Sequence, residues 1–395
     1  MVSVSDLFLL NPKSELDDNM KVGFIPMALV EDGFSGNHFY EERTWKDVKR
    51  GYCHFQNGDI GIAKISPCFE NRKSTIFKNL PNTYGAGTTE LVILRPIKVY
   101  TKFYLYLFKS DWYVKEGTKY FKGVVGQQRV HKEIFTDLHI PLPPFAEQQR
   151  IVEEIEYWFA LIDQIEQDKS DLQTAIRQTK SKILDLAIHG KLVLQNPNDE
   201  PASELLKRIN PKAEITCDNG HYPVGWIDVI LGDIFYHNTG KALNSSNKEG
   251  VLRNYLTTSN VYWNQFDLSL VKQMPFRDNE LEKCTVQKGD LLVCEGGDVG
   301  RSAIWNFDYN ICIQNHIHRL RPKGDLNVSF YYYVLRFLKE HNRIGGKGIG
   351  LLGLSSNELH KIGMPLPPRK EQDRIVLKIE ELFSVLDNIE NALEA

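Results

Sequence analysis

The stretch PLPPFAEQQRIV at residues 141–152 returns almost unchanged as PLPPRKEQDRIV at residues 365–376. Matches at the same offset of 224 positions continue through Ile165-Glu166, which answers Ile389-Glu390. Chance does not place so many identities at one fixed spacing, so the chain is an internal duplication. Two copies that fold alike predict a pseudo-two-fold arrangement, and duplex DNA offers equivalent sites related in the same way.

Each copy of this stretch predicts a long helix with a sharp start. Prolines cannot continue a helix from upstream but suit its first turn. Glu147 and Glu371 then lie where the positive end of the helix dipole favours a carboxylate.

Apolar residues behind each start follow a four-three spacing that is typical of a coiled-coil seam. In the first copy Lys169 and Thr179 interrupt the spacing, and the second copy has no interruption. The seam residues are Ile151, Ile155, Trp158, Ile162, Ile165, Leu172, Ile176, Ile183 and Leu186, and then Ile375, Ile379, Leu382, Leu386, Ile389 and Leu393. We expect the two helices to pair as antiparallel coiled-coil helices. The alternative is an ordinary amphipathic helix on a globular core, but about 45 residues, roughly 67 Å at 1.5 Å per residue, exceed the width of a domain.

Fainter matches extend the duplication upstream, with free variation between them. Asp6-Leu7-Phe8 and Asn11 answer Asp233-Ile234-Phe235 and Asn238, Gly58-Asp59-Ile60 answers Gly289-Asp290-Leu291, and Arg95-Pro96 answers Arg321-Pro322. A constant framework around variable content indicates two modules that share a fold and differ in what they bind.

The pattern predicts α+β modules in four segments: residues 1–140, 141–210 with the first helix and a linker, 211–364, and 365–395 with the second helix. Expected strands are 24–30, 59–65, 91–94 and 138–140, then 256–261, 290–294 and 317–320. Expected helices are 102–110, 132–135, 202–209, 329–340 and 357–360. Gly190 is a natural end for the first long helix.

Composition excludes several classes of protein. With 395 residues, 42% of them hydrophobic, the chain can bury two substantial cores. It has no run of eighteen apolar residues and no basic leader at its first residues, so we expect no membrane contact and a cytoplasmic location. The six cysteines form no C-x-x-C pair, which argues against a zinc or redox site.

Charge is distributed unevenly. The helical segments 141–210 and 365–395 carry net charges of −4 and −3, whereas residues 1–140 and 211–364 carry +3 and +1. This weakly supports nucleic-acid binding by the globular parts, with other subunits adding affinity.

Enzyme signatures are missing. Gly345-Gly346-Lys347-Gly348 is followed by glycine where a phosphate loop needs a hydroxyl, and Leu142 stands where an adenine methyltransferase needs a polar residue before Pro-Pro-aromatic. His316 and His318 share a strand face without a third ligand, so a metal site is not expected. We expect no cofactor.

The remaining signals are those of recognition. Two glycine-rich loops, at 123–129 and 345–350, occupy matching places, and basic residues follow the Gly-Asp strands. Glycine allows close approach of the backbone to a ligand, and Gln and Arg bind base edges with two hydrogen bonds. The alternative is that these are solvated loop charges. The candidate DNA-binding residues are Lys64, Arg72, Lys73, Lys119, Lys122, Gln127, Gln128, Arg129, Arg301, Gln314, Asn315, His316 and Lys347.

Over nearly its whole length the chain resembles the specificity subunit of type I restriction-modification systems. The resemblance rests on the duplicated Pro-Leu-Pro-Pro-x-x-Glu-Gln-x-x-Ile-Val starts, on Gly190-Lys191-Leu192-Val193 with Asn198-Asp199-Glu200-Pro201-Ala202, and on Gly225-Trp226 before Leu231-Gly232-Asp233. The resemblance implies two target-recognition domains that each read part of a split site in double-stranded DNA. It also implies docking of two DNA methyltransferase subunits, which carry S-adenosylmethionine, and of ATP-driven restriction subunits, with no catalysis by this chain.

The copies differ at one place. The second helix stops at Ala395, so residues 172–209 have no counterpart, and the leader 222–231 has none before Asp6. We therefore expect one of two things: either the outer part of the first helix packs against a methyltransferase subunit, or the start of the protein lies upstream of Met1. Two other classes stay open from the residues alone: a self-contained DNA methyltransferase or nuclease, and a coiled-coil protein without a nucleic-acid role.

Overall fold

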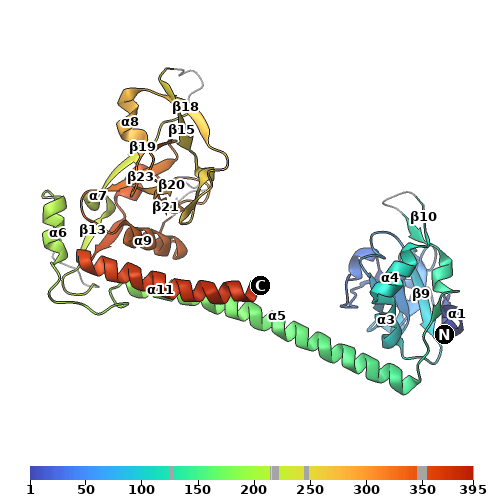
Figure 1. Ribbon diagram of the computed structural model, residues 1–395. Helices are drawn as coiled ribbons and strands as arrows, with labels where there is room; N and C mark the ends of the chain where they lie inside the picture. Colours follow the sequence, from blue (N-terminus) through green and yellow to red (C-terminus); the bar gives the residue numbers. More distant parts are fainter. Residues whose placement is uncertain (124–127, 214, 216–221, 244–248, 345–353, 395) are drawn as a thin grey trace. The chain divides into compact units, whose positions relative to one another are not determined.

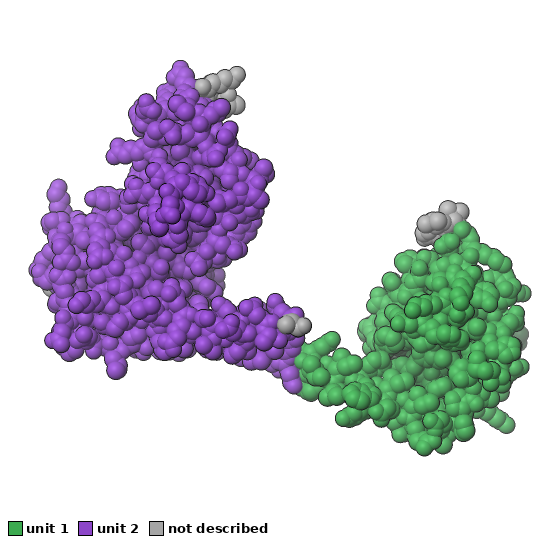
Figure 2. Space-filling view, viewed as in Figure 1, with its two compact units in different colours: residues 1–166 green, residues 167–395 purple. Residues whose placement is uncertain are grey.

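The computed structural model describes residues 1–123, 128–213, 215, 222–243, 249–344 and 354–394. The chain divides into two compact units, residues 1–166 and residues 167–395 (Figure 2). Each unit contains one globular module and part of the long helix α5 (Phe145–Ile188).

Module 1, the globular part of the first unit, is built on two four-stranded sheets (Figure 1). One has the strand order β2 (Phe8–Leu10), β9 (Leu91–Pro96), β6 (Ile60–Ala63), β7 (Ser74–Ile76), and the other β4 (Glu41–Thr44), β3 (Lys21–Ile25), β8 (Tyr84–Gly87), β5 (Cys53–Gln56). All neighbours are antiparallel except β3 and β8. The remaining elements are β1 (Val2–Ser3), α1 (Val4–Leu7), η1 (Met27–Leu29), α2 (Trp45–Val48), η2 (Pro81–Thr83), α3 (Thr101–Lys109), α4 (Asp111–Thr118), β10 (Phe121–Lys122), β11 (Arg129–Val130), η3 (Lys132–Phe135) and β12 (His139–Ile140).

Module 2, in the second unit, repeats both strand orders. Its sheets run β14 (Phe235–Thr239), β23 (Ile317–Pro322), β20 (Leu291–Cys294), β21 (Ser302–Ile304), and β18 (Lys272–Phe276), β15 (Val251–Leu256), β22 (Ile311–Ile313), β19 (Thr285–Val286), with β15 and β22 parallel. The other elements are α6 (Ala202–Ile209), β13 (Ile227–Ile230), α7 (Leu231–Ile234), η4 (Thr258–Asn260), β16 (Val261–Tyr262), β17 (Gln265–Phe266), α8 (Asp278–Cys284), α9 (Val328–Glu340), α10 (Ser356–His360), β24 (Gly363–Leu366) and α11 (Arg369–Glu394). The same order of strands in both modules, down to the single parallel pair, confirms the duplication and the α+β class.

Two of the expected strands are wrong in their extent. The segment 24–30 contains the end of β3 and then the 3-10 helix η1, and the segment 256–261 contains the end of β15 and then η4. In the first copy the apolar run continues past the strand through Met27 and Leu29, so hydrophobicity alone does not mark the end of β3. In the second copy the turn is polar, and Asn260 Oδ1 accepts the Thr257 N–H at 2.8 Å where the strand ends.

Each module carries the same buried ion pair between its first sheet's middle strands. Arg95 on β9 donates two hydrogen bonds of 2.9 Å to Asp59, and Arg321 on β23 donates bonds of 2.8 and 2.6 Å to Asp290. Each aspartate also accepts the backbone N–H three residues before it, at Gln56 or Gln287. Two-fold donation from a planar guanidinium fixes the geometry, so these pairs hold the turn before β6 and β20 in one shape.

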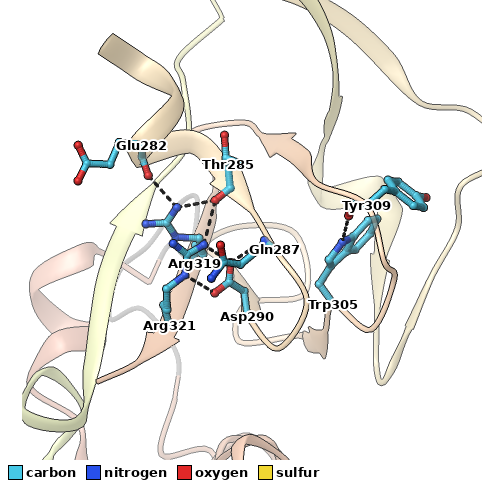
Figure 3. A network of polar contacts seen from close by, with 8 residues as sticks. All are labelled: Glu282, Thr285, Gln287, Asp290, Trp305, Tyr309, Arg319 and Arg321. Atoms are coloured by element: carbon cyan, nitrogen blue, oxygen red, sulfur yellow. Dashed lines mark hydrogen bonds and ion pairs between the residues drawn. The ribbon is translucent and has the colours of Figure 1, made fainter. Parts of the chain in front are cut away.

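Module 2 adds a second arginine to this network, which Figure 3 shows beside the ion pair. Arg319 is 3% exposed and donates to the carbonyl oxygens of Glu282 and Thr285, at 3.0 and 2.5 Å. Its place on β23 corresponds to Ile93 on β9, because both lie two residues before the paired arginine. The extra arginine therefore ties the end of α8 to the first sheet in this module alone.

In each copy of the repeated stretch, one glutamine binds the start of the long helix to its module. We call this contact the glutamine latch. Gln148 Oε1 accepts the backbone N–H of Tyr100 at 2.9 Å while Nε2 donates to the Pro143 carbonyl at 2.8 Å. Gln372 does the same with Asn327 N–H and the Pro367 carbonyl, at 2.9 and 3.0 Å. Both glutamines are buried, so each latch satisfies polar backbone groups that would otherwise lack partners at the start of α3 or α9.

The helices α5 and α11 pack against each other in antiparallel directions within the second unit (Figure 1). Lys180 on α5 contacts Asp387 at 2.6 Å and Glu390 at 2.7 Å, while Ile188, further along α5, shares a core with Ile375. The predicted contact between the two long helices is confirmed. Gly190 follows the helix with φ +65°, as a helix-ending glycine does.

The seam is shorter than the four-three spacing suggests. Ile176 and Ile183 are buried, but Trp158, Ile162 and Ile165 are 53%, 47% and 58% exposed. The 26 residues of α11 reach only the last turns of the 44-residue α5. Apolar periodicity predicts that a helix face packs against a partner, but it does not predict what length of that face the partner covers.

A hydrogen-bonded pair of histidines, His237 and His318, joins β14 to β23 and to Leu354. His318 Nε2 lies 2.8 Å from the Leu354 carbonyl, which can only accept, so His318 donates there and accepts at Nδ1 from His237 Nε2, 2.9 Å away. Burial, aided by the neighbouring His318 and His360, lowers the pKa of His237 to about 4. Burial also lowers the pKa of His318.

Replacement of either latch glutamine by leucine is expected to destabilise the protein. Gln148→Leu or Gln372→Leu leaves one backbone N–H and one carbonyl without a partner, at a cost of about 1–3 kcal/mol for each group that stays buried. The melting temperature should fall by several degrees in calorimetry. Gln149→Leu, at an exposed neighbouring position, is the matched control. Equal melting temperatures for Gln148→Leu and Gln149→Leu would show that the latch contributes nothing.

Stability should fall on acidification because of the histidine pair. A lowered pKa means that the folded chain binds fewer protons than the unfolded chain between about pH 6.5 and pH 4, so the stabilisation is present above pH 6.5 and is lost as the pH falls through this window. The urea midpoint should therefore drop between pH 7 and pH 5, and His237→Gln, which keeps a donor, should reduce the drop. His316→Gln, at a 55% exposed side chain, should retain the full pH dependence.

Candidate nucleic-acid interface

The hairpin of β10 and β11 forms one wall of a basic groove on module 1. Its strand β11 joins the end of β6, where the Val130 N–H donates to the Lys64 carbonyl at 2.8 Å. This places the hairpin beside the C-terminal end of β6, at the opposite end of that strand from the turn that the Asp59–Arg95 pair fixes. The groove encloses about 330 Å³ and is lined by Leu10, Asn11, Lys64, Val92, Lys122, Arg129, Val130, His131, Lys132 and Phe135.

Positive charge dominates this groove over an apolar floor. Arg129 is paired with Glu90 through contacts of 2.7 to 3.1 Å, and this pairing lowers the pKa of the Glu90 carboxyl. Among the residues that the structure describes, Lys64, Lys122 and Lys132 make no ion pair. Three ammonium groups around a hollow are suited to bind phosphate or acceptor atoms of bases.

The predicted residues Lys64, Lys122 and Arg129 are thus brought together, although they lie up to 65 positions apart in the chain. Three groove residues were missed as site candidates: Asn11, His131 and Lys132. Asn11 was available from the sequence as an anchor of the duplication, because it answers Asn238. In the structure its Oδ1 accepts the Ile93 N–H at 2.9 Å, which fixes the side chain at the edge of the groove.

Arg72, Lys73 and Lys119 lie outside this groove. Arg72 donates to the Lys109 carbonyl at 2.9 Å and forms an ion pair with Asp111, and Lys73 donates to the Val30 carbonyl at 2.8 Å. Lys119 pairs with Glu116 on its own helix α4. Arg72 and Lys73 therefore have partners within the module that DNA would have to displace.

A buried lysine explains why the Arg72 loop is held inward. Lys109 Nζ donates to the carbonyls of Gly33 and Arg72, at 2.7 and 3.0 Å, and is fully buried. Burial, with a smaller effect of the nearby Arg72 charge, lowers the pKa of Lys109 to about 8. Two carbonyls solvate the ammonium group in place of water, so Lys109 connects two loops of the module.

In module 2 the predicted residues Gln314, Asn315 and His316 form the connection between β22 and β23. Asn315 N–H donates to the Lys241 carbonyl at 2.9 Å, and exposed His316 lies 3.1 Å from Glu295 Oε2. Glu295 follows β20 as Lys64 follows β6. The two modules thus place opposite charges at the corresponding position.

Arg301 is held inside module 2. Its Nη2 donates to the Thr258 carbonyl at 2.5 Å, and its guanidinium lies 4.9 Å from the centre of the Tyr262 ring. Gln127 and Lys347 lie outside the described residues. Gln128 accepts the Ser66 N–H at its carbonyl, at 2.9 Å, which joins the end of the hairpin to the residue Ser66.

A second polar hollow in module 2 was missed from the sequence. It encloses about 540 Å³ and is lined in part by Arg253, Asn254 and Gln273, side chains of the types that read base edges. Gln273 Nε2 donates to Asn254 Oδ1 at 2.9 Å. Arg253 and Asn254 belong to a run of four exposed residues at the start of β15, and Gln273 lies on the exposed start of β18, so no alternation with core residues marked them.

Other chemistry has no support in the described residues. No group of three or more histidine, cysteine, aspartate or glutamate side chains there could hold a metal ion. Cys53, Cys68, Cys284, Cys294 and Cys312 form no disulfide. None of the described helices is long and apolar enough to cross a bilayer.

Comparison with known proteins identifies the family. The family model described as "Type I restriction modification DNA specificity domain" matches twice, over residues 5–174 and 223–395. The specificity subunit of the type I restriction enzyme EcoAI from Escherichia coli is 31% identical, with 96% of this chain and 76% of that protein covered. The EcoEI specificity subunit from Escherichia coli is 30% identical, with 100% of this chain and 79% of that protein covered.

Solved structures agree in fold. The HsdS subunit from Thermoanaerobacter tengcongensis superposes with a TM-score of 0.65 at 18% identity, over 99% of this chain and 92% of that one. A chain from a structure of a type I restriction-modification system assembly gives the same score and identity. Two matching domains and near-complete coverage by two curated relatives leave one assignment: the chain is a member of the type I restriction-modification specificity subunits, the non-catalytic DNA-specificity component of these systems.

Proposed function

We propose that each module reads one part of a divided site in double-stranded DNA, with α5 and α11 as the spacer between the readers. The observation that carries this proposal is the pairing of one strand framework with two different polar surfaces. Module 1 has a groove with three unpaired lysines where module 2 has Glu295 and His316. Readers of different sequences need different donors and acceptors on the same scaffold.

The chain would act inside a larger complex in the cytoplasm. Its relatives are named as subunits of restriction enzymes, and one similar structure comes from work on complex assembly of a type I system. We propose that two DNA methyltransferase subunits and the restriction subunits are the partners, and that they bring the cofactors. The modest positive charge of the modules supports a need for further DNA contacts from such partners.

Within module 1 we propose that Lys64, Lys122, Arg129 and Lys132 contact DNA, with Asn11 at the groove edge. On binding DNA, Arg129 would give up some of its hydrogen bonds to Glu90 and donate instead to an acceptor atom of a base or a phosphate. In module 2 the connection 314–316 and the Arg253–Asn254–Gln273 surface are the corresponding candidates. Gln127, Gln128 and Lys347 stay predictions, as do Arg72, Lys73, Lys119 and Arg301.

Exchange of residues 1–140 for those of a relative with another target should change one half of the methylated sequence. The other half should stay the same, because module 2 and its framework are untouched. Sequencing of modified bases in cells that carry the chimaera measures both halves at once. A change in both halves would contradict independent reading by the two modules.

Lys64→Ala and Lys122→Ala should each weaken DNA binding by the assembled methyltransferase. If each lysine contacts one phosphate, the slope of log affinity against log salt should become shallower by about 1. Fluorescence anisotropy with a duplex from the modified genome, at several salt concentrations, gives this slope. Lys207→Ala is the matched control, since Lys207 lies on α6, is no candidate DNA contact and pairs with Glu204 on its own helix. Equal slopes for all three variants would exclude the groove from the interface.

A further inference from the structure

The residue that follows β6 in module 1 is held by backbone hydrogen bonds on both sides. The Lys64 N–H donates to the Glu90 carbonyl at 2.9 Å, and the Lys64 carbonyl accepts from the Val130 N–H at 2.8 Å. The backbone at this position is therefore fixed, while the lysine side chain is one wall of the basic groove.

The residue that follows β20 in module 2 is held in the same way. The Glu295 N–H donates to the His316 carbonyl at 3.0 Å, and the Glu295 carbonyl accepts from the Leu354 N–H at 2.9 Å. Both strands pair with the same neighbour in the first sheet, β6 with β9 and β20 with β23. Glu295 therefore stands where module 1 has Lys64, on an equivalent backbone.

The side chains on this shared backbone have opposite chemistry. In module 1 a lysine lies near a carboxylate, and Arg129 and, more weakly, Lys64 lower the pKa of Glu90. In module 2 the carboxylate belongs to Glu295 and faces the imidazole of His316, with 3.1 Å between Oε2 and Nδ1. The reversal changes which groups the surface can bind without a change in the fold.

His316 orients the carboxylate and leaves one of its oxygens available. A carboxylate can only accept, so His316 Nδ1 donates to Glu295 Oε2. Within the part of the chain that the structure describes, this is the one hydrogen bond to the Glu295 side chain, which is 30% exposed. Oε1 can therefore accept from a group outside the module.

The support beneath this position is rigid. His318 donates to the Leu354 carbonyl at 2.8 Å and accepts from His237 at 2.9 Å, so Leu354 is held through its carbonyl as well as its N–H. In the strand register of module 1, Leu10 and Val92 take the places of the two histidines and belong to the lining of the groove. The two modules thus differ in the lining below this position as well as at the position itself.

Lysine and glutamate recognise opposite features of a base edge in the major groove. An ammonium group donates to O6 or N7 of guanine or to O4 of thymine, whereas a carboxylate needs an exocyclic amino group, N4 of cytosine or N6 of adenine. The amino group of adenine lies next to N7, whose lone pair repels a carboxylate, and the amino group of cytosine lies next to a C–H group. Cytosine is therefore the base that suits Glu295 best.

We infer that Glu295 determines specificity in the half-site of module 2, where its Oε1 accepts a hydrogen bond from the N4 amino group of a cytosine. This inference rests on the proposed function, because it requires that module 2 reads bases. Lys64 is the counterpart in module 1 and donates to guanine or thymine.

A structural role for Glu295 alone does not account for the reversal. Lys64 makes no ion pair with any residue that the structure describes, so the backbone at this position keeps its shape without a charged partner for the side chain. A carboxylate is also repelled by the phosphates of a duplex. A hydrogen bond from a base amino group offsets that repulsion.

Glu295→Gln tests the inference in the assembled methyltransferase. The amide keeps an acceptor for His316 but loses the charge and can donate as well, so the fold should be retained and the choice of base relaxed. Methylation is measured on duplexes in which each base pair of the modified site is replaced in turn. Discrimination should fall about 10-fold at one C·G pair in the half-site of module 2 and stay the same at the other pairs.

Two further variants complete the test. Glu295→Lys reverses the charge and should favour guanine or thymine in place of that cytosine. Glu381→Gln is the matched control, because it removes the same charge from an exposed side chain of α11, and it should keep every preference of the unchanged chain.

Three results would overturn the inference. They are unchanged preferences for Glu295→Gln, an equal loss of methylation at all positions, which would make Glu295 structural, and relaxation at an A·T pair. Exchange of residues 1–140 separates this failure from failure of the proposed function. If that exchange changes one half-site while Glu295→Gln changes nothing, only the role of Glu295 is wrong.

Discussion

The glutamine latch is the constraint on which the arrangement of each copy depends. It fastens the first turn of α5 or α11 to the start of α3 or α9, and α3 and α9 pack on the first sheet of their modules. The prolines before it fix where the helix begins, since the carbonyls of Pro144 and Pro368 accept the first helical N–H groups. A long helix can carry a module rigidly only if its first turn cannot swing, and the latch supplies that restraint.

The sequence predicted the framework well because duplication exposes it. The repeated Asp59–Arg95 anchors, the latch glutamines and Gly190 all proved to be positions where geometry admits few alternatives. The end of β3 was mispredicted because the 3-10 turn η1 continues the apolar run, and the end of β15 because the polar 3-10 turn η4 lies within the expected strand. The coverage of the α5 seam could not be predicted, since a face built for a helix has the same periodicity whether or not the helix is present.

The interface was harder to predict than the fold, for a physical reason. Lysines and arginines in loops gain their role from whether neighbours already neutralise them, which sequence does not state. Arg72 and Arg301 are engaged by backbone carbonyls, whereas Lys64 and Lys122 meet across a groove. Asn254 and Gln273 were overlooked because they lie at exposed strand starts, where no alternation with core residues distinguishes them from solvated positions. Only the tertiary arrangement separates structural cations from those available to DNA.

The latch also has an evolutionary consequence. Its glutamine bonds to main-chain atoms, so an aromatic residue at position 100 and an amide at position 327 serve equally well. Because the contact does not depend on the side chain at positions 100 and 327, it is retained when related genes recombine at this junction. New combinations of readers can thus arise without remodelling the joint that carries them, so recombination alone is enough to renew a repertoire of target sites.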